Sequence, residues 1–305
     1  MSNTVSRIDA LALVGPTASG KTAAALAIAA RWPVEIISMD SALVYRGMDI
    51  GTAKPTMQDR TDVPHHCLDL VEATERFTVS DYQLAARTAV ADITSRGANA
   101  LVVAGTGLYL TALIDELEFP GEYSEVRREL EGERRIEMLY RRLEELDPLA
   151  ASRIEPTNRR RIERALEVTI GSGKPFSSFG PGTGAYPDNG VTQIGILWPR
   201  EVLAKRVEAR VHRMMEQGFL AEVKSLVESR ALSHTARQAL GYAELIDHLH
   251  GECSLDEAVA DIVVHTRQFA VRQERWFRRD PRIRWITVNE DPVAEIAPVL
   301  AEILH

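Results

Sequence analysis

The segment GPTASGKT, residues 15–22, has the residue types and the spacing of a loop that binds phosphate groups. Gly15 and Gly20 let the backbone turn sharply and approach a ligand closely. The helix that we expect to begin here directs free N–H groups and a positive dipole end at an anion. Lys21 adds a positive charge, and the hydroxyl of Thr22 is a suitable ligand for Mg²⁺. The sequence therefore predicts a site for a phosphorylated ligand.

An acidic residue is missing from the position where nucleotide-hydrolysing proteins usually carry one. Those proteins hold Mg²⁺ with an acid at the end of a hydrophobic strand. Here the apolar run ALVVAG (100–105) is followed by Thr106 and Gly107, and an acid, Asp40, follows the preceding strand instead. Because the carboxyl ends of parallel strands converge, we expect Asp40 and Thr106 to lie near Lys21. Asp40 is then a metal ligand or a base, with a helix N-cap as the alternative.

The elements around these residues alternate between strand and helix. Apolar runs predict strands, and the alanine-rich segment 21–31 predicts the helix after the loop. Another helix is expected over 79–96, with Ser80 as its N-cap. This pattern predicts an α/β fold with a P-loop-type parallel sheet core flanked by helices. The expected strands cover residues 8–14, 34–38, 100–105, 191–198 and 283–288.

A change of composition divides the chain. Residues 122–147 are rich in Glu and Arg at helical spacing, and residues 171–190 are rich in Gly, Pro and Ser. We therefore expect residues 1–119 and 191–305 to form the P-loop α/β catalytic core. Residues 120–190 are expected to form a mostly helical insertion domain.

The overall composition is that of an ordinary globular protein. The 305 residues are 45% hydrophobic and 26% charged, with a net charge of −8, so any nucleic-acid contact must come from local basic patches. The two cysteines, Cys67 and Cys253, are far apart, which favours a reducing cytoplasmic setting. No apolar run is long enough to predict a transmembrane helix. We expect no membrane association, and a monomer.

One basic patch stands out late in the chain. Between residues 262 and 285 there are seven arginines and only two acids. Gln268, Arg272, Arg275 and Arg279 recur at spacings of four, three and four, so they share one face of a helix. This face is suited to RNA phosphates, and a solvated basic surface is the alternative interpretation.

Six segments occur in a characteristic order: GPTASGKT (15–22), SMDSALVYRGMDIGTAKP (38–55), AGTGLYL (104–110), RRRIERALEV (159–168), ARQALGY (236–242) and TRQFAVRQERWFRR (266–279). Together they resemble the motifs of the tRNA dimethylallyltransferase (tRNA isopentenyltransferase) family, over nearly the whole chain. No zinc-finger extension of the eukaryotic kind follows, so we expect the bacterial type. Two departures are Ala104, where the family usually has glycine, and a shortened region around 122–135.

The resemblance implies an activity. The family transfers a dimethylallyl group from dimethylallyl diphosphate to the exocyclic amine (N6) of the adenine immediately 3′ of the tRNA anticodon, and diphosphate is released. Dimethylallyl diphosphate and the tRNA anticodon stem-loop are the implied partners, Mg²⁺ is the implied cofactor, and the insertion domain is implied to contact tRNA. The loop at 15–22 then holds a diphosphate without a nucleotide.

The resemblance also implies residue roles. Asp40 is the general base for the adenine amine, and Thr106 hydrogen-bonds near that base. Thr17 and Arg210 reach the bridging oxygen that leaves, although Arg210 could instead belong to a solvated helix face. Thr22 is the implied metal ligand. The implied diphosphate-binding residues are Gly15, Pro16, Thr17, Ala18, Ser19, Gly20, Lys21 and Thr22.

The implied tRNA contacts combine arginines for phosphates and base edges, Gln238 for a base edge and Tyr242 for stacking. Their target adenine must be swung out of the anticodon loop to reach Asp40. The implied set is Asp40, Ser41, Ala42, Leu43, Thr106, Arg128, Arg160, Arg161, Ile162, Glu163, Arg164, Arg237, Gln238, Ala239, Leu240, Gly241, Tyr242, Gln268, Arg272 and Arg275.

Two other functions stay open at this stage. A P-loop ATP-dependent small-molecule kinase would use the same loop for a nucleotide. A non-catalytic RNA-binding protein could retain the loop as a relic, although Lys21 and Thr22 are both intact. His65 and His66 are adjacent, but with no third ligand at a suitable spacing we interpret them as structural or substrate-adjacent and not zinc-binding.

Overall fold

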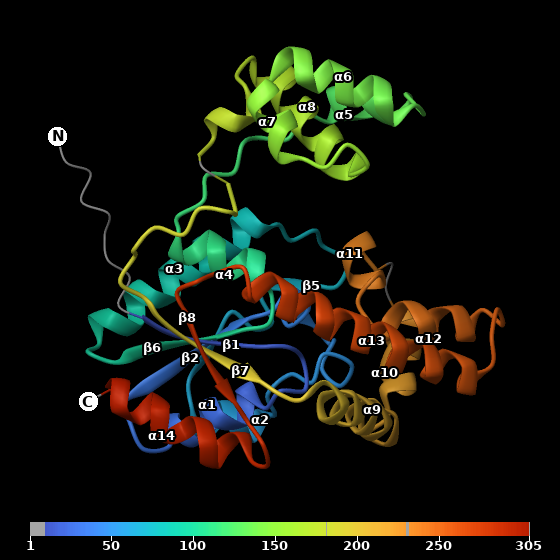
Figure 1. Cartoon of the computed structure of the whole chain (residues 1–305). Helices are drawn as coiled ribbons and strands as arrows, with labels where there is room; N and C mark the ends of the chain where they lie inside the picture. Colours follow the sequence, from blue (N-terminus) through green and yellow to red (C-terminus); the bar gives the residue numbers. More distant parts are fainter. Residues whose placement is uncertain (1–9, 181, 230–231, 305) are drawn as a thin grey trace. The chain divides into compact units, whose positions relative to one another are not determined.

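A computed structural model describes residues 10–180, 182–229 and 232–304 (Figure 1). Contacts within the chain divide it into two compact units. The first comprises Met1–Asp115 and Tyr186–His305, and the second comprises Glu116–Ala185. The division lies a few residues before each boundary that the sequence suggests. The start of the first expected strand, residues 8–9, lies outside the described part of the chain.

Within the described residues, six strands form the central sheet of the first unit: β1 (Ala10–Val14), β2 (Val34–Met39), β4 (His65–His66), β6 (Asn99–Ala104), β7 (Thr192–Leu197) and β8 (Ile283–Thr287). The strands lie in the order β4–β2–β6–β1–β7–β8, and every pair is parallel. A second small sheet pairs β3 (Tyr45–Arg46) with β5 (Val71–Glu72). The predicted parallel α/β fold is confirmed.

Helices cover both faces of the central sheet (Figure 1). Leu11 and Leu13 of β1 pack on one side with α1 (Lys21–Ala29) and α14 (Pro292–Leu304). Ala12 and Val14 pack on the other side with α3 (Val79–Ser95) and α4 (Gly107–Ile114). Successive side chains of a strand point to opposite faces, so this buried strand is apolar throughout.

Of the remaining helices of the first unit, α2 (Met57–Asp62) follows β3. The others follow β7: α9 (Arg200–Glu216), α10 (Phe219–Ser229), α11 (His234–Arg237), α12 (Tyr242–Leu249) and α13 (Leu255–Phe277). Two local differences from the sequence expectations concern α3 and α14. The N-cap of α3 is Thr78, which forms a capping box with Asp81, and not Ser80. The helix α14 covers α1 and was not expected.

The second unit is helical and has its own apolar core. Its elements are α5 (Ser124–Glu131), α6 (Ile136–Leu146), α7 (Pro148–Arg153), α8 (Arg159–Ser172) and the short 3₁₀ helix η1 (Phe176–Ser178). Leu139 and Leu143 of α6 pack against Ile162 and Leu166 of α8. Glu167 of α8 is buried and binds Arg164 of the same helix and Arg127 of α5, and the Arg127 contact joins α5 to α8.

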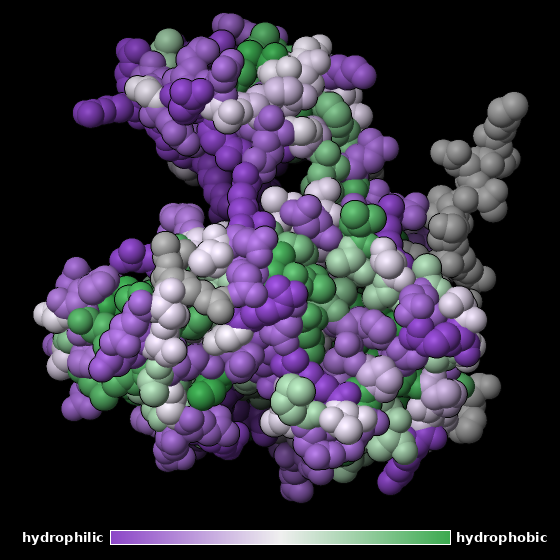
Figure 2. Space-filling view, turned by 180° about the vertical axis from the view of Figure 1, so that it is seen from behind, coloured by the Kyte–Doolittle hydropathy of each residue, from purple (hydrophilic) through white to green (hydrophobic). Residues whose placement is uncertain are grey.

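Hydrophilic residues dominate the face of the molecule seen in Figure 2, with hydrophobic residues gathered in separate patches. No helix among the described residues combines the length and the apolar character that crossing a bilayer requires.

Candidate active site

The order of the strands brings three chain segments to one end of the sheet. β6 lies between β1 and β2, so the loop after β1, Asp40 after β2 and Thr106 after β6 are neighbours. The amides of Gly105 and Thr106 donate to Met39 O at 3.1 and 3.2 Å. The hydroxyl of Thr106 accepts from the amide of Ser41 at 3.2 Å. The expected proximity of Asp40 and Thr106 is therefore present.

Within the segment 15–22, the loop ends at Gly20 and α1 begins at Lys21. Gly20 is the N-cap of α1, and its φ of 95° is in the left-handed region. A Cβ there would lie 2.4 Å from Pro292 of α14, so no larger residue fits. No side chain caps α1. Side chains elsewhere hold the loop by its carbonyl groups: Trp198 Nε1 donates to Ser19 O at 2.9 Å, and Arg206 Nε donates to Ala18 O at 2.9 Å. The amide end of α1 is left for a ligand.

A pocket opens above this loop and is rich in positive charge. Lys21 and Arg210 both line it, together with a single carboxylate, that of Asp40. Lys21 Nζ donates to Gly15 O and Pro16 O at 2.9 and 2.8 Å, and Arg210 Nη2 donates to Thr52 O at 3.4 Å. Neither cation forms an ion pair with a carboxylate among the described residues. Two partly buried cations without matching acids are suited to an anion.

The pKa values express the same imbalance. The pKa of Lys21 is lowered to about 7, mainly because the ammonium is buried and also because Arg210 is positive, while Asp40 opposes the shift. Burial also lowers the pKa of Arg210, Asp40 opposes that shift, and Arg213 adds to it. Arg210 is partly buried and lines the pocket, so it does not belong to a solvated helix face. A bound anion would favour the charged form of both groups.

Asp40 is held in one orientation by its own chain. Its Oδ1 accepts from the amide of Ala42 at 2.9 Å. Its Oδ2 lies 3.3 Å from where a Cβ on Gly105 would be, and no described residue donates a hydrogen bond to it. One carboxylate oxygen is thus fixed, and the other is available in the pocket as a base or a ligand.

Gln273 joins the phosphate loop to the end of β6 and was not predicted from the sequence. Its Oε1 accepts from the amide of Thr17 at 2.8 Å, and its Nε2 donates to Gly105 O at 2.8 Å. The only available signal was position: Gln273 lies four residues after Phe269 on the face of α13 that lines the pocket. The amide side chain fixes the distance between the loop and the segment that carries Thr106.

The rest of the pocket is lined by both apolar and polar side chains. Phe269 lines it together with aliphatic side chains, and its polar members beyond those described above include Thr22, Thr52 and His65. The apolar lining residues are Ala25, Ile36, Leu43, Ala53, Pro55 and Val103. Leu43, expected at the tRNA, is therefore part of the pocket wall. Such a lining accommodates a small hydrocarbon group next to an anion.

Three comparisons with known proteins agree. The family described as IPP transferase matches residues 43–280. A tRNA dimethylallyltransferase of Thermobifida fusca is 46% identical over 94% of this chain and 92% of that protein. One from Kineococcus radiotolerans is 44% identical over 96% of this chain and 97% of that protein. The crystal structure of a tRNA isopentenylpyrophosphate transferase from Bacillus halodurans is 36% identical, with a TM-score of 0.71, covering 97% of both chains.

The chain belongs to the IPP transferase family. The predicted resemblance is confirmed by the family match over residues 43–280 and by relatives whose similarity covers 94% and 96% of this chain.

Most polar residues expected at tRNA are exposed in this structure. On α13, Gln268, Arg272 and Arg275 share one exposed face, as the spacing predicts. The other exposed members are Arg128, Arg160, Arg161, Arg237 and Gln238. Ala239 and Leu240 are partly buried between α11 and α12. Their contact with tRNA stays a prediction.

Three of the expected tRNA residues are buried in the core instead. Tyr242 is fully buried, and its hydroxyl donates to Glu222 at 2.6 Å, so the prediction that its ring stacks on a base is wrong. Gly241 beside it is buried as well. Ile162 is fully buried against α6, because its position on α8 faces inward. These three residues pack inside the protein, whereas other residues of the same two motifs are exposed.

Charged residues of α8 have partners within the second unit. Glu163 pairs with Arg159 at 2.7 Å. Arg164 donates to Pro120 O at 2.7 Å and pairs with Glu167 at 3.0 Å. The position of Arg164 is explained by these structural contacts.

The residues present fit a Mg²⁺ ion that a ligand's phosphates help to hold. Among the described residues, no group of three or more His, Cys, Asp or Glu side chains could bind a metal. The hydroxyl of Thr22 and the carboxylate of Asp40 line the pocket. Mg²⁺ commonly takes one or two protein oxygens and completes its shell with phosphate and water oxygens. His66 is instead bound to Glu35 at 2.7 Å.

The lowered pKa of Lys21 predicts that anion binding weakens as the pH rises. The free protein loses the Lys21 proton as the pH passes about 7, whereas a bound anion restores the charge and raises the pKa. Binding therefore takes up a proton above this pH, and the affinity falls by up to about tenfold per pH unit. Calorimetric titration with inorganic diphosphate at a series of pH values measures this.

The control for this titration is Lys21→Arg, whose guanidinium stays charged over the whole range. Its curve reports only the ionisation of diphosphate itself. Parallel curves for the two proteins would show that Lys21 does not titrate in the pocket.

Proposed function

We propose that this chain transfers a dimethylallyl group from dimethylallyl diphosphate to N6 of the adenine 3′ of the tRNA anticodon, with release of diphosphate. One observation carries the proposal: two cations without acidic partners, Lys21 and Arg210, line the same pocket as an available carboxylate oxygen of Asp40, together with apolar side chains. Family membership supports the same transfer, since the named relatives are tRNA dimethylallyltransferases.

The first task in the transfer is to stabilise the leaving diphosphate. As the bond between the allylic carbon and the bridging oxygen breaks, both bonding electrons remain on the diphosphate. Lys21, Arg210 and the amide end of α1 offset this growing negative charge, and the hydroxyl of Thr17 lies in the same pocket. Bound Mg²⁺, held by Thr22, would add a further positive charge on the phosphate oxygens.

The second task is to remove a proton from the acceptor. The lone pair of the adenine amine is delocalised into the ring, and the nitrogen becomes acidic as it bonds to the allylic carbon. Asp40 Oδ2 takes that proton. Thr106 keeps the segment after Asp40 in place through the amide of Ser41 at 3.2 Å. The base reaches this site only when it is swung out of the anticodon loop.

The two other functions are not supported. The named relatives are transferases acting on tRNA, not kinases or binding proteins. An acid after β6, which nucleotide-hydrolysing proteins use for Mg²⁺, is replaced by Thr106. We propose in addition that the protein acts as a monomer in the cytoplasm, where Cys67 and Cys253 stay reduced; both are free thiols in the structure.

The proposed reaction is tested by incubating the purified protein with dimethylallyl diphosphate, Mg²⁺ and total tRNA. Mass spectrometry of the digested nucleosides should show adenosine heavier by one dimethylallyl group. The same mixture with ATP in place of the prenyl donor should release no phosphate. ATP consumption without prenylated adenosine would favour the kinase and overturn the proposal.

Substitution of the base separates chemistry from binding. Asp40→Asn retains an oxygen that can accept from the amide of Ala42 but cannot take up a proton. We expect kcat to fall by about 10²- to 10⁴-fold, while the affinity for diphosphate changes less than about threefold. Steady-state kinetics and calorimetry measure the two effects. The control is Asp62→Asn on α2, which is exposed and should retain full activity. Normal turnover by Asp40→Asn would show that Asp40 has only a structural role.

The exposed face of α13 predicts salt-dependent tRNA binding. Removing two phosphate contacts in Arg272→Ala/Arg275→Ala should weaken tRNA binding and reduce the slope of log K against log salt by about 1.4. The KM for dimethylallyl diphosphate should be unchanged. Filter binding at several salt concentrations measures the slope, with Lys224→Ala on α10 as an exposed control. An unaltered slope would mean that this face is only a solvated surface.

A further inference from the structure

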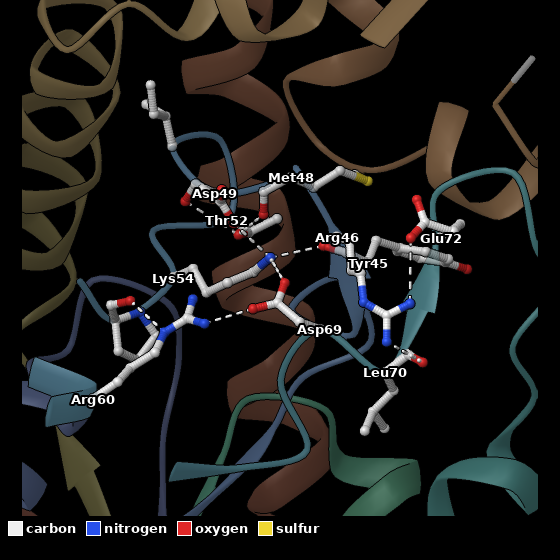
Figure 3. Close-up of polar contacts among 12 residues, drawn as sticks. Tyr45, Arg46, Met48, Asp49, Thr52, Lys54, Arg60, Asp69, Leu70 and Glu72 are labelled. Carbon is white, nitrogen blue, oxygen red and sulfur yellow. Dashed lines mark hydrogen bonds and ion pairs between the residues drawn. The ribbon is translucent and has the colours of Figure 1, made fainter. Parts of the chain in front are cut away.

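Lys54 lies at a junction of three chain segments, shown in Figure 3. Its side chain has no exposed surface. The ammonium group donates to Tyr45 O at 2.7 Å and contacts Asp69 Oδ1 and Asp49 Oδ1, each at 2.7 Å. A lysine ammonium has three protons, and each has an acceptor here. Two carboxylates offset the cost of burying the charge, so the group acts as a fixed three-way connection.

Asp69 extends this connection. Its Oδ2 pairs with Arg60 at 2.5 Å, and Arg60 Nε donates to Pro55 O at 2.9 Å. Hydrogen bonds from Lys54 and Arg60 hold the pKa of Asp69 below its usual value, although burial alone would raise it. Asp69 and Ala53 both have a positive φ, 51° and 49°, which side chains with a Cβ rarely adopt. The charged contacts therefore hold an unfavourable backbone.

The other side of this segment forms a wall of the pocket. Thr52, Ala53 and Pro55 line the pocket, and Thr52 O accepts from Arg210 at 3.4 Å. The segment is wound tightly, because Lys54 N donates to Asp49 O at 2.9 Å. The backbone that receives Arg210 is thus only two residues from the buried ammonium.

Glu222 of α10 provides an independent attachment for the same segment. Its carboxylate accepts from the amides of Asp49, Ile50 and Gly51 at 2.9, 2.7 and 3.1 Å. This attachment holds the start of the segment, whereas Lys54 holds its end. The two can be separated by substitution.

We propose that Lys54 is a positioning residue for the diphosphate pocket. It fixes residues 52–55 so that the Thr52 carbonyl holds Arg210 toward the leaving group and the wall stays closed around it. The inference rests on the proposed function, because it takes diphosphate to be the occupant of the pocket. Lys54 itself contacts no substrate.

The test compares Lys54→Met with Arg46→Met. Methionine retains the length of the apolar stem and removes the charge in both. Arg46 pairs with Glu72 at 3.3 Å on the exposed side of the same region and does not line the pocket, which makes it a matched control. Calorimetric titration of the full chain with inorganic diphosphate should show binding weakened about tenfold or more in Lys54→Met and less than about twofold in Arg46→Met.

A second readout and a second variant keep the test decisive. Hydrogen exchange of the peptide covering 48–56 should accelerate in Lys54→Met. Asp49→Asn removes the negative charge of one Lys54 partner at a side chain that is 57% exposed, so the fold should persist, and diphosphate binding should weaken by about threefold. This variant remains informative if Lys54→Met does not fold.

The outcomes separate this inference from the proposed function. If the parent protein does not bind diphosphate, the proposed function fails. If the parent binds it and both Asp49→Asn and folded Lys54→Met bind it equally well, Lys54 is only structural and the inference is overturned. A lowered melting temperature without a change in diphosphate affinity overturns it in the same way.

Discussion

The site depends on a charge imbalance in a partly buried place. Lys21 and Lys54 show the contrast. Lys54 has two carboxylates and a carbonyl around its ammonium, whereas Lys21 has only the carbonyls of its own loop at 2.8 and 2.9 Å. A cation held only by neutral dipoles is destabilised, and the lowered pKa of Lys21 expresses this. An anionic ligand supplies the negative charge that is missing next to Lys21 and Arg210.

The order of the strands brings the charged groups of the site together. Placing β6 between β1 and β2 sets the acid of one strand end beside the phosphate loop of another. Gln273 then fixes the separation, because one amide side chain binds both the loop and the β6 end. Opposite them, Lys54 and Glu222 shape the wall that holds Arg210. The cation pocket and the base are thus positioned by separate parts of the sequence.

The sequence predicted those site residues whose positions follow from local spacing or from the order of strands and helices. The loop spacing located Lys21, and the convergence of strand ends located Asp40 and Thr106. Gln273 and Glu222 were missed because their partners are backbone groups far away in the sequence. Lys54 was missed because its carboxylate partners lie in irregular segments, where no helix or strand period relates their positions. Tyr242 and Ile162 were misassigned since they lie within motifs whose neighbours are exposed, and only packing against Phe219 and α6 shows that they face inward.

A crystal structure with inorganic diphosphate tests the central claim most directly. The account predicts diphosphate at the amide end of α1, within about 3 Å of both Lys21 Nζ and the Arg210 guanidinium, with Asp40 Oδ2 left open beside it. Diphosphate bound elsewhere, with Lys21 still on its own loop carbonyls, would contradict the account. A complete nucleoside triphosphate filling the pocket would contradict it as well.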